Sequence, residues 1–333
     1  ILSNSKRLRD LSREYSTLNE VIEKWHETQA LESEIASVKE MLQDSDQEMR
    51  EMAEAEHAEL TESLEAANAA LKLLMLPKDP YEGRTILLEI RAGTGGDEAA
   101  LFAADLYRMY SRYADTVGLK MEEISTSATG SGIGLKEIVV SISGAAAYNT
   151  FRFESGVHRV QRVPATESQG RVHTSAATVA VLPEPDEIEL KIENKDLRID
   201  TMRAGGPGGQ SVNTTDSAVR IVHIPTGLTV ICQDEKSQLK NKAKAMRVLK
   251  ARLLEKQEAE AHAKAAAERK AQVGSGDRSE RIRTYNFPQN RLTDHRVNLT
   301  IYKLDSIVDG DLNEVIDFLT KEHQAKLLAS VSS

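Results

Sequence analysis

The sequence predicts an α+β protein built from several domains. With 333 residues, the chain exceeds one ordinary compact domain. From Leu8 to about Leu76 it contains no glycine or proline and repeats apolar residues at helical spacing. Alternating runs typical of strands follow, and then a glycine-rich loop, a hairpin and a long helix rich in alanine and lysine. Helices and strands therefore occupy largely separate regions.

We expect a helical N-terminal domain over residues 1–80, made of two or more long helices and ended by Pro77 and Pro80. Residues 81–195 should form a mixed α/β domain with one helix from Asp97 to about Val117. The strands expected in it span residues 85–90, 121–125, 136–142, 157–163, 174–182 and 187–192.

A second α/β domain is expected over residues 196–284. It should contain a strand at 197–202, the loop 204–210, a hairpin of strands 218–224 and 228–233, and a helix at 238–271. Residues 285–333 carry a strand-like run at 298–304 and a helix at 312–328. We expect them to form a C-terminal unit packed on the domain of residues 81–195.

Composition indicates the cellular compartment in which the protein works. The single cysteine, Cys232, lies in an apolar run and cannot form an internal disulfide, so we expect it to be buried in a protein of a reducing compartment. No apolar stretch is long enough to span a bilayer, and no secretory leader is visible in a chain that begins at Ile1. These features predict a cytoplasmic protein without a membrane partner.

The net charge of −9 is unevenly distributed. Residues 1–80 contain 18 acidic and 9 basic side chains, which accounts for the whole excess. Residues 196–284 contain 17 basic and 11 acidic side chains. An acidic arm and a basic module are thus joined in one chain, and the basic module suits a polyanion such as RNA.

Gly93-Thr94-Gly95-Gly96 lies between a predicted strand and a predicted helix, where backbone amides often bind phosphate. No Gly-Lys-Ser/Thr follows, and Asp97 and Glu98 would repel a phosphate. A tight turn with acidic capping is one interpretation. A helix tip whose carboxylate contacts a base edge is the other.

Metal and cofactor chemistry is not predicted. The eight histidines are scattered without metal-ligand spacing, and no serine lies in a Gly-x-Ser-x-Gly elbow. Hydrogen-bonding side chains instead crowd around Pro164, a pattern suited to unpaired RNA bases. They are Gln161, Arg162, Thr166, Gln169, Arg171, His173 and Thr174.

The segment from Gly205 to Gln210 reads as a linker when it is considered alone. A linker would not need the polar residues Asn213 to Asp216 that follow, nor the basic module around it. Consecutive glycines permit close approach to a ligand, but glutamine cannot act as a general acid or base near neutral pH. Chemistry at this loop would depend on positioning a water and on backbone N–H groups aimed at developing negative charge.

Four motifs carry a resemblance to a known family. They are Leu11-Ser12-Arg13-Glu14-Tyr15, the run from Arg91 to Ala100, the run from His158 to Pro164, and the run from Arg283 to Gln289. In this order they resemble the bacterial-type class I peptide chain release factors of the release factor 1 type. The resemblance covers nearly the whole chain.

The resemblance implies that Gly208, Gly209 and Gln210 are the catalytic element, which enters the peptidyl transferase centre and promotes hydrolysis of the peptidyl-tRNA ester. The backbone N–H of Gln210 would stabilise the transition state, and its side chain would place water. The same glutamine would carry N5-methylation, with a glutamine methyltransferase as partner. Because the ribosome supplies much of the site, the resemblance implies a codon-dependent trigger more than a stand-alone enzyme.

Codon choice in the family rests on a tripeptide, matched here by Pro164, Ala165 and Thr166, which implies the stop codons UAA and UAG. Carried over residue by residue, Gly95 and Glu98 would contact the first base. His173 would stack between bases, and Gln161 and Thr174 would read the third base. Residues 278–296 resemble the switch loop that repositions the catalytic domain.

The implied partners are the ribosome, with its rRNA, the A-site stop codon and the P-site peptidyl-tRNA, and a GTPase class II release factor. Three alternatives stay open. One is a UGA-reading relative, which Pro164-Ala165-Thr166 disfavours. Another is a rescue hydrolase, which would lack the segment from Arg91 to Leu182. The last is a non-catalytic RNA-binding module.

Overall fold

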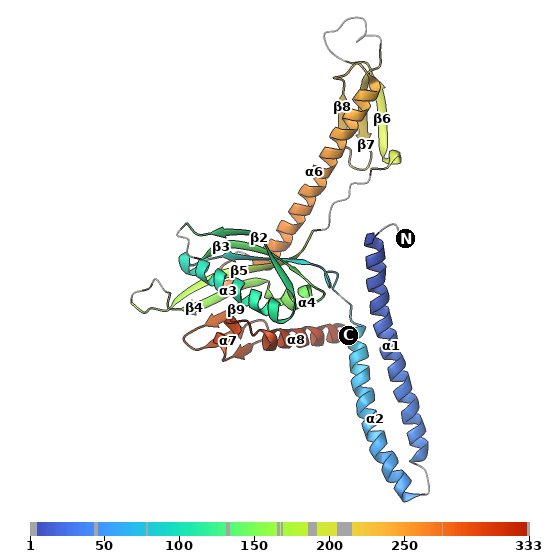
Figure 1. The fold of residues 1–333 in the computed structure, drawn as a ribbon, viewed down its shortest axis with the longest axis vertical. Coiled ribbons are helices and arrows are strands. Elements are labelled where there is room, and N and C mark those ends of the chain that lie inside the picture. Colours follow the sequence, from blue (N-terminus) through green and yellow to red (C-terminus); the bar gives the residue numbers. More distant parts are fainter. Residues whose placement is uncertain are drawn as a thin grey trace. The chain divides into compact units, whose positions relative to one another are not determined.

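The protein is described by a computed structural model that covers residues 5–42, 46–77, 79–130, 134–164, 167, 169–185, 192–204, 215–274 and 276–331. Its chain divides into two compact units, one of residues 1–82 with 312–333 and one of residues 83–311. Both helices and mixed sheets are present (Figure 1), so the predicted α+β multidomain class is confirmed. The finer division into four domains stays a prediction.

The first unit is helical. It contains the helices α1 (Ser5–Met41), α2 (Gln47–Leu74) and α8 (Asn313–Val331). Asp46 begins α2, because its side chain accepts a hydrogen bond from the backbone N–H of Glu48 at 3.1 Å. The side chains of Ile35 and Val38 on α1 are buried, as is that of Ala67 on α2, and the two helices pack as a hairpin. The long helices predicted for this region are confirmed.

The second unit contains an eight-stranded sheet with the order β11-β10-β9-β4-β5-β1-β3-β2. All its pairings are antiparallel except that of β4 with β9. Its strands are β1 (Ile86–Ala92), β2 (Lys120–Ala128), β3 (Leu135–Ser143), β4 (Gly156–Arg162), β5 (His173–Pro183), β9 (Arg281–Asn286), β10 (Arg291–Asp294) and β11 (Leu299–Ile301). Sequence runs far apart thus meet at the β4–β9 pairing.

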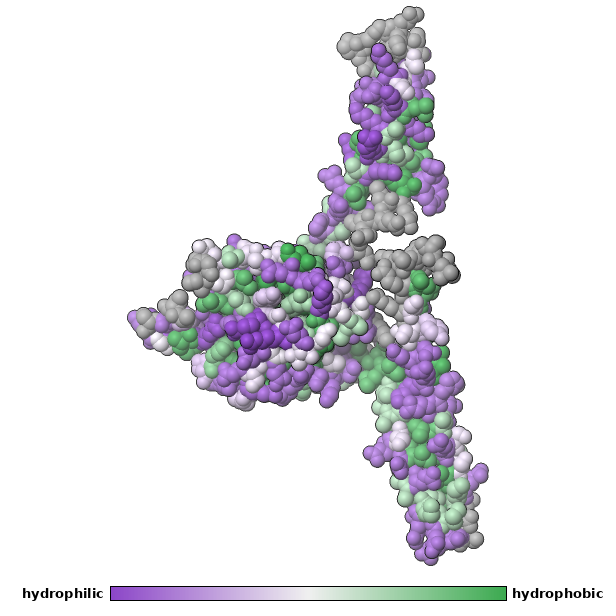
Figure 2. All heavy atoms as spheres, in the orientation of Figure 1, coloured by the Kyte–Doolittle hydropathy of each residue, from purple (hydrophilic) through white to green (hydrophobic). Residues whose placement is uncertain are grey.

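Helix α3 (Asp97–Thr116) packs on this sheet. Its buried side includes Phe102, whose ring lies 5.3 Å from that of Tyr285 on β9, and Tyr110, whose ring lies 5.7 Å from that of Phe151. Strongly hydrophilic side chains gather along α3 on the surface shown in Figure 2. The shorter helices of this region are α4 (Ala147–Phe151), η1 (Arg152–Glu154), η3 (Arg278–Glu280) and α7 (Leu304–Val308).

A three-stranded sheet and a long helix complete the second unit. Its elements are η2 (Asn194–Asp196), β6 (Leu197–Met202), β7 (Ala218–His223), β8 (Thr229–Cys232) and α6 (Gln238–Val273), with the strand order β6-β7-β8. Ala245, Leu249 and Leu253 of α6 are buried against Val219, Ile221, Val230 and Cys232. The predicted hairpin, the long helix and the burial of Cys232 are confirmed.

Some elements differ from the expectation. Strands β9 and β10 lie within residues 278–296, where no strand was predicted, and α4 was also not predicted. The strand expected at 298–304 is limited to Leu299–Ile301, and α7 follows it directly. Most of the strand expected at 187–192 lies outside the described residues.

Candidate functional site

The turn between β1 and α3 is joined to β5 by backbone hydrogen bonds. Gly93 N donates to Ala176 O at 2.9 Å, and Ala176 N donates to Thr94 O at 2.9 Å. The pairing of β1 with β5 therefore continues past the end of β1 and holds the turn against the first residues of β5.

Two glycines permit this close approach. Gly95 has a φ of +139°, and a Cβ there would lie 2.3 Å from Ser175 Oγ. Gly96, which directly precedes α3, has a φ of +61°, and a Cβ there would meet no atom within 4 Å. Side chains rarely adopt such backbone conformations, so the turn requires glycine. Of the two earlier interpretations, the structure shows the tight turn directly, and the turn presents the N-terminus of α3 beside β5.

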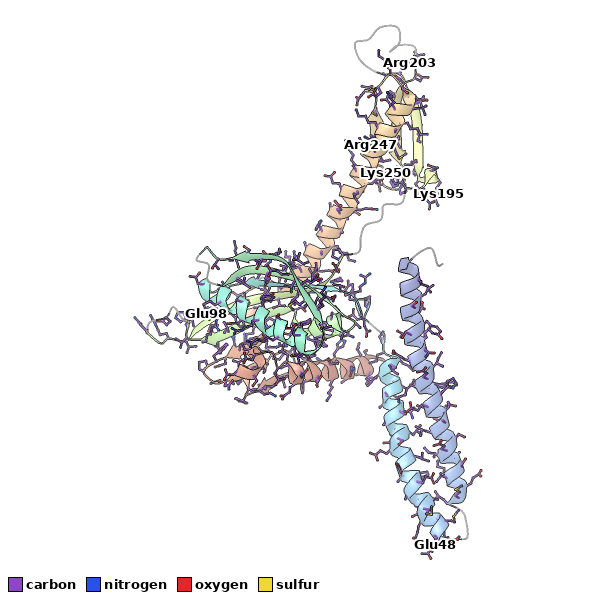
Figure 3. The ribbon with its side chains drawn as sticks, viewed as in Figure 1. Glu48, Glu98, Lys195, Arg203, Arg247 and Lys250 are labelled. Atoms are coloured by element: carbon purple, nitrogen blue, oxygen red, sulfur yellow. The ribbon has the colours of Figure 1, made fainter. Side chains whose placement is uncertain are left out.

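Glu98 lies in the first turn of α3 and is only 6% exposed (Figure 3). Its Oε1 accepts a hydrogen bond from Arg162 Nε at 2.5 Å, while its Oε2 is buried and has no hydrogen-bond partner among the described residues. A negative charge at a helix N-terminus is favourable, but a buried carboxylate oxygen without a donor is costly.

Arg162 ends β4 and also donates from Nη1 to Asp105 Oδ2 at 2.6 Å. Asp105 lies seven residues after Glu98, so the two carboxylates lie on one side of α3. Burial alone would lower the pKa of Arg162, but hydrogen bonds to Asp105 and Glu98 and their charges raise it above its ordinary value. Its guanidinium carbon lies 5.2 Å from the centroid of the Phe287 ring.

The ends of β4 and β5 bring further polar residues together. Gln161 is paired with Thr174, and Arg162 with His173. Because side chains alternate along a strand, Gln161 and Thr174 share one face of the sheet, whereas Arg162 and His173 share the other. Gln161 is also held through Asn286, whose Nδ2 donates to Gln161 Oε1 at 3.3 Å.

His173 is half-exposed and is held by a carboxylate. Its Nε2 donates to Glu167 Oε2 at 2.6 Å, because a carboxylate can only accept. The backbone N–H of Gln169 donates to the other oxygen of Glu167 at 2.7 Å. This bond, together with that from His173, holds the pKa of Glu167 below its usual value. Glu167 thus orients the imidazole.

The predicted reading residues that the structure describes lie around the paired ends of β4 and β5 and the turn that begins α3, a region called the reading edge below. Gly95 contacts Ser175 on β5, Glu98 is bound to Arg162, and the backbone oxygen of Pro164 accepts from Glu167 N at 3.0 Å. Gln161, His173 and Thr174 lie at the paired strand ends. Ala165 and Thr166 lie outside the described residues.

The sequence did not single out four residues that support this edge: Glu167, Asp105, Asn286 and Phe287. Asp105 follows Glu98 by two helical turns, and Asn286 and Phe287 lie in the run from Arg283 to Gln289 that carries the resemblance, but neither signal indicated a contact with Gln161 or Arg162. Asn286 and Phe287 approach Gln161 and Arg162 only because β9 pairs with β4. No local pattern indicates that pairing.

The glycine-rich loop belongs to the basic module. Gly208, Gly209 and Gln210 lie outside the described residues, but both ends of their loop are described. Met202 and Ala218 are paired across β6 and β7, so the loop connects two adjacent strands of a hairpin. Gln238 at the start of α6 donates to Asp216 O at 3.0 Å, which supports one end of the loop.

The surface of the basic module carries the cations that were predicted from charge. Figure 3 labels Arg203 beside the loop, Arg247 and Lys250 on α6, and Lys195 just before β6. Arg203 Nε lies 3.9 Å from Asp216 Oδ1, and both side chains are exposed, so this ion pair contributes little to stability. The described part of the module thus carries exposed cations just before the loop, at Arg203, and along α6, at Arg247 and Lys250.

No helix among the described residues has the length and apolar character needed to cross a bilayer. Within the same residues, no group of three or more His, Cys, Asp or Glu side chains could hold a metal ion.

Comparison with known proteins defines the class first. Residues 1–179 match the PCRF domain, and residues 186–296 match the RF-1 domain. The first match spans the helical arm and the edge that contains Glu98 and Gln161, and the second spans the glycine-rich loop. These two domains in this order are those of peptide chain release factors.

Curated relatives define the family within that class. The chain is 58% identical over 328 residues to peptide chain release factor 1 of Maridesulfovibrio salexigens, covering 98% of this chain and 92% of the relative. It is also 58% identical to that of Magnetococcus marinus over 330 residues, covering 98% and 91%. The chain belongs to the peptide chain release factor 1 family. Among solved structures it matches RF2 of Thermus thermophilus at 37% identity and a TM-score of 0.48, covering 93% and 86%.

Proposed function

We infer that the chain is a translation termination factor, which recognises UAA and UAG in the ribosomal A site and triggers hydrolysis of the peptidyl-tRNA ester. Membership of the release factor 1 family supports this function. The tripeptide Pro164-Ala165-Thr166 supports the choice of codons. The ribosome is the partner that the family implies, and the basic module around the loop suits its RNA.

One structural observation carries the codon-reading part of the proposal. Glu98 at the start of α3 is bound to Arg162 at the end of β4, next to the paired strand ends that hold His173, Gln161 and Thr174, although 76 residues separate Glu98 from Thr174 in the sequence. Donors, acceptors and a stackable ring are the groups that recognise unpaired RNA bases. We assign Glu98 and Gly95 to the first base, His173 to stacking, and Gln161 and Thr174 to the third base, with Pro164, Ala165 and Thr166 completing the site.

The proposed chemistry rests on the backbone of the loop. Gln210 carries no group that titrates near neutral pH, so it cannot remove a proton from water. Its backbone N–H can stabilise negative charge that develops in the transition state, and its side chain can place the attacking water. The P-site ester belongs to the ribosome, and the chain therefore acts there as a codon-dependent trigger.

The deciding experiment measures peptide release from programmed ribosomes that carry UAA, UAG, UGA or a sense codon in the A site. We expect release at UAA and UAG alone. Release at UGA would make the chain a UGA-reading relative, and release without a stop codon would make it a rescue hydrolase. An absence of release at every codon would contradict catalysis and leave an RNA-binding module.

The backbone mechanism has its own test at Gln210. Gln210→Pro removes the N–H, and we expect release at UAA to fall about 10²- to 10³-fold, the usual effect of losing one such donor. Gln210→Ala keeps the N–H and should retain part of the release activity. Single-turnover release at saturating factor measures both, and an equal loss in the two variants would contradict the backbone mechanism.

The remaining parts of the proposal concern the cellular compartment, the modification of Gln210 and a protein partner. We propose that the protein acts in the cytoplasm, that a glutamine methyltransferase modifies the side-chain nitrogen of Gln210, and that a GTPase class II release factor acts with it. Mass spectrometry of the peptide containing Gln210 from the native protein tests the modification, since N5-methylation adds one methylene mass. An unmodified peptide would exclude it.

A further inference from the structure

Four arginines gather on the side of the eight-stranded sheet that lies away from α3. They are Arg159 on β4, Arg278 in η3, Arg281 at the start of β9 and Arg291 at the start of β10, and they are called the arginine cluster below. Side chains alternate along β4, so Arg159 lies on the face opposite to that of Arg162, whose guanidinium donates to α3.

Strand pairing places two further members of the cluster on the same face. Arg281 is paired with Val157 on β4, and Asn286 is paired with Gln161. Arg291 is paired in turn with Asn286. Val157 and Gln161 share a face with the arginine midway between them, because alternate residues of a strand point the same way. The arginine cluster therefore lies on the face that presents Gln161, the residue assigned to the third base.

The positive charges of the arginine cluster are close to one another and lack a counter-charge. Burial lowers the pKa of Arg159, and the nearby charges of Arg281 and Arg278 lower it further. Burial also lowers the pKa of His295, and the charges of Arg281 and Arg159 add to that effect. Among the described residues, no carboxylate forms an ion pair with any member of the cluster. Like charges placed in this way repel one another, so the cluster favours an anion.

Hydrogen bonds within the chain use only part of these guanidinium groups. Arg159 Nε donates to Thr284 Oγ1 at 3.2 Å, and Arg281 Nη1 donates to Ser279 O at 3.3 Å. The Nε atoms of Arg281 and Arg291 are buried and have no hydrogen-bond partner in the part of the chain that is described, so a ligand cannot reach them either. Both side chains are half-buried, and it is their terminal Nη groups that can meet a ligand.

We propose that the arginine cluster is a binding site for a phosphate group of RNA. Guanidinium groups donate to phosphate oxygens in pairs, and an anion held between them removes their mutual repulsion. Phosphate contacts fix the position of a nucleic acid without reading its sequence. The cluster thus holds the RNA backbone beside Gln161 while other residues read the bases. This inference rests on the proposed function and names a contact of the same protein with its RNA partner.

The test compares Arg281→Gln with Arg112→Gln, which removes the same charge from α3 on the other side of the sheet, at an exposed ion pair with Asp309. Single-turnover release at UAA and UAG is measured against factor concentration. For Arg281→Gln we expect the half-saturating concentration to rise about tenfold at both codons, the usual effect of losing one hydrogen bond to a charged group, with the maximal rate unchanged. Arg112→Gln should change neither quantity.

Salt dependence identifies the contact as one with phosphate. The logarithm of the affinity falls linearly with the logarithm of the salt concentration, with a slope of about 0.7 to 0.9 for each neutralised phosphate. We expect Arg281→Gln to reduce the slope by about that amount, and Arg281→Lys, which keeps the charge, to retain most of it. Arg112→Gln should have the slope of the unmodified chain.

The phosphate belongs either to the message or to ribosomal RNA, and a shortened message separates the two. The same titration is repeated on a message that ends at the third nucleotide of UAA. An effect of Arg281→Gln that disappears there assigns the phosphate to the message beyond the stop codon, whereas an effect that persists assigns it to ribosomal RNA.

Urea denaturation of the free chain separates binding from folding. Because Arg281→Gln removes repulsion and breaks no ion pair among the described residues, we expect the variant to be at least as stable as the unmodified chain. An unchanged half-saturating concentration or an unchanged salt slope in Arg281→Gln overturns the inference, as does a destabilised variant that loses only maximal rate. Failure of the unmodified chain to release peptide at UAA overturns the proposed function itself, which is a distinct result.

Discussion

At the scale of single residues, Arg283 lies at the centre of a buried ionic network. Arg283 on β9 is fully buried and donates from two nitrogens to Glu154, at 2.6 and 2.9 Å. Its Nε donates to Asp294 Oδ2 at 3.2 Å, and Tyr110 Oη donates to Glu154 at 2.7 Å. Removing these charges from water is expensive, so the network is favourable only while every group keeps its partners.

Arg283→Met tests this dependence. The substitution keeps an apolar side chain in the core but leaves Glu154 without a cation and Asp294 with Arg296 alone, so we expect the free energy of unfolding to fall by about 3–5 kcal/mol. Urea denaturation followed by circular dichroism measures the change. Arg198→Met, at an exposed ion pair on β6, should change it by less than about 1 kcal/mol. Similar small changes in both variants would contradict a stabilising network.

His158 belongs to the same network and predicts a pH dependence. Its Nε2 donates to Glu154 O at 2.8 Å, so its Nδ1 accepts from the Tyr285 hydroxyl at 3.1 Å and the ring is neutral. Burial lowers the pKa of His158 from 6.5 to about 4. Between these values the unfolded chain binds a proton that the folded chain does not. The stability contributed by neutral His158 is therefore complete above pH 6.5 and is lost as the pH falls toward 4.

The expected loss is at most about 3 kcal/mol over this range. Urea denaturation at pH 7, 6 and 5 should show it, and His158→Gln should remove most of the slope between pH 6.5 and 5. Burial alone would raise the pKa of Glu154, but the charge and hydrogen bonds of Arg283 hold it below its usual value, so Glu154 adds to the loss only at lower pH. An unchanged slope in His158→Gln would assign the pH dependence to other groups.

At the scale of elements, the sequence indicated most helices and strands, because each has its own local pattern. The 20 residues of α3 alternate buried and exposed groups with helical spacing, and the second half of β5 is an apolar run from Val179 to Leu182. Pairing between elements has no such pattern. Arg283, Thr284 and Tyr285 are polar or aromatic, and they form a strand only because β4 and β10 flank them. The sequence could name candidate site residues, but it could not indicate the contacts between them.

The turn before α3 gives a prediction at this scale. Gly95→Ala would place a Cβ 2.3 Å from Ser175 Oγ, so the turn must move away from β5 and carry Glu98 with it. We expect release at UAA to fall and the protein to lose about 1–3 kcal/mol of stability. Gly96→Ala meets no neighbouring atom, so its cost of about 1–3 kcal/mol should come from the strain at a φ of +61° alone and should not push the turn away from β5. Adding Ser175→Gly to Gly95→Ala should restore part of the loss, and no restoration would contradict the steric cause.

At the scale of the whole molecule, α6 joins two structures. Its first half is buried in the core of the three-stranded sheet through Ala245 and Leu249. Its last turns contact the eight-stranded sheet. There Gln272 Oε1 accepts from Val181 N on β5 at 2.9 Å, and Gln272 Nε2 donates to Val181 O at 2.8 Å. Arg269 Nη2 also lies 2.6 Å from the buried carboxylate of Glu89 on β1. The three-stranded sheet of the basic module and the eight-stranded sheet are thus linked by one helix that is anchored at both ends.

Gln272→Ala should release the second anchor. Val181 lies beyond the paired part of β4, so the amide of Gln272 satisfies backbone groups that no neighbouring strand reaches on that side. We expect faster amide hydrogen exchange in residues 262–273 and at Val181, with unchanged protection in β6, β7 and β8. Gln257→Ala, an exposed position on the same helix, controls for lost helix contacts. If exchange rises equally in β7 and β8, the helix transmits the change through its whole length and the two anchors are not independent. If exchange stays unchanged at Val181, the pairing with Gln272 does not hold α6 on the sheet.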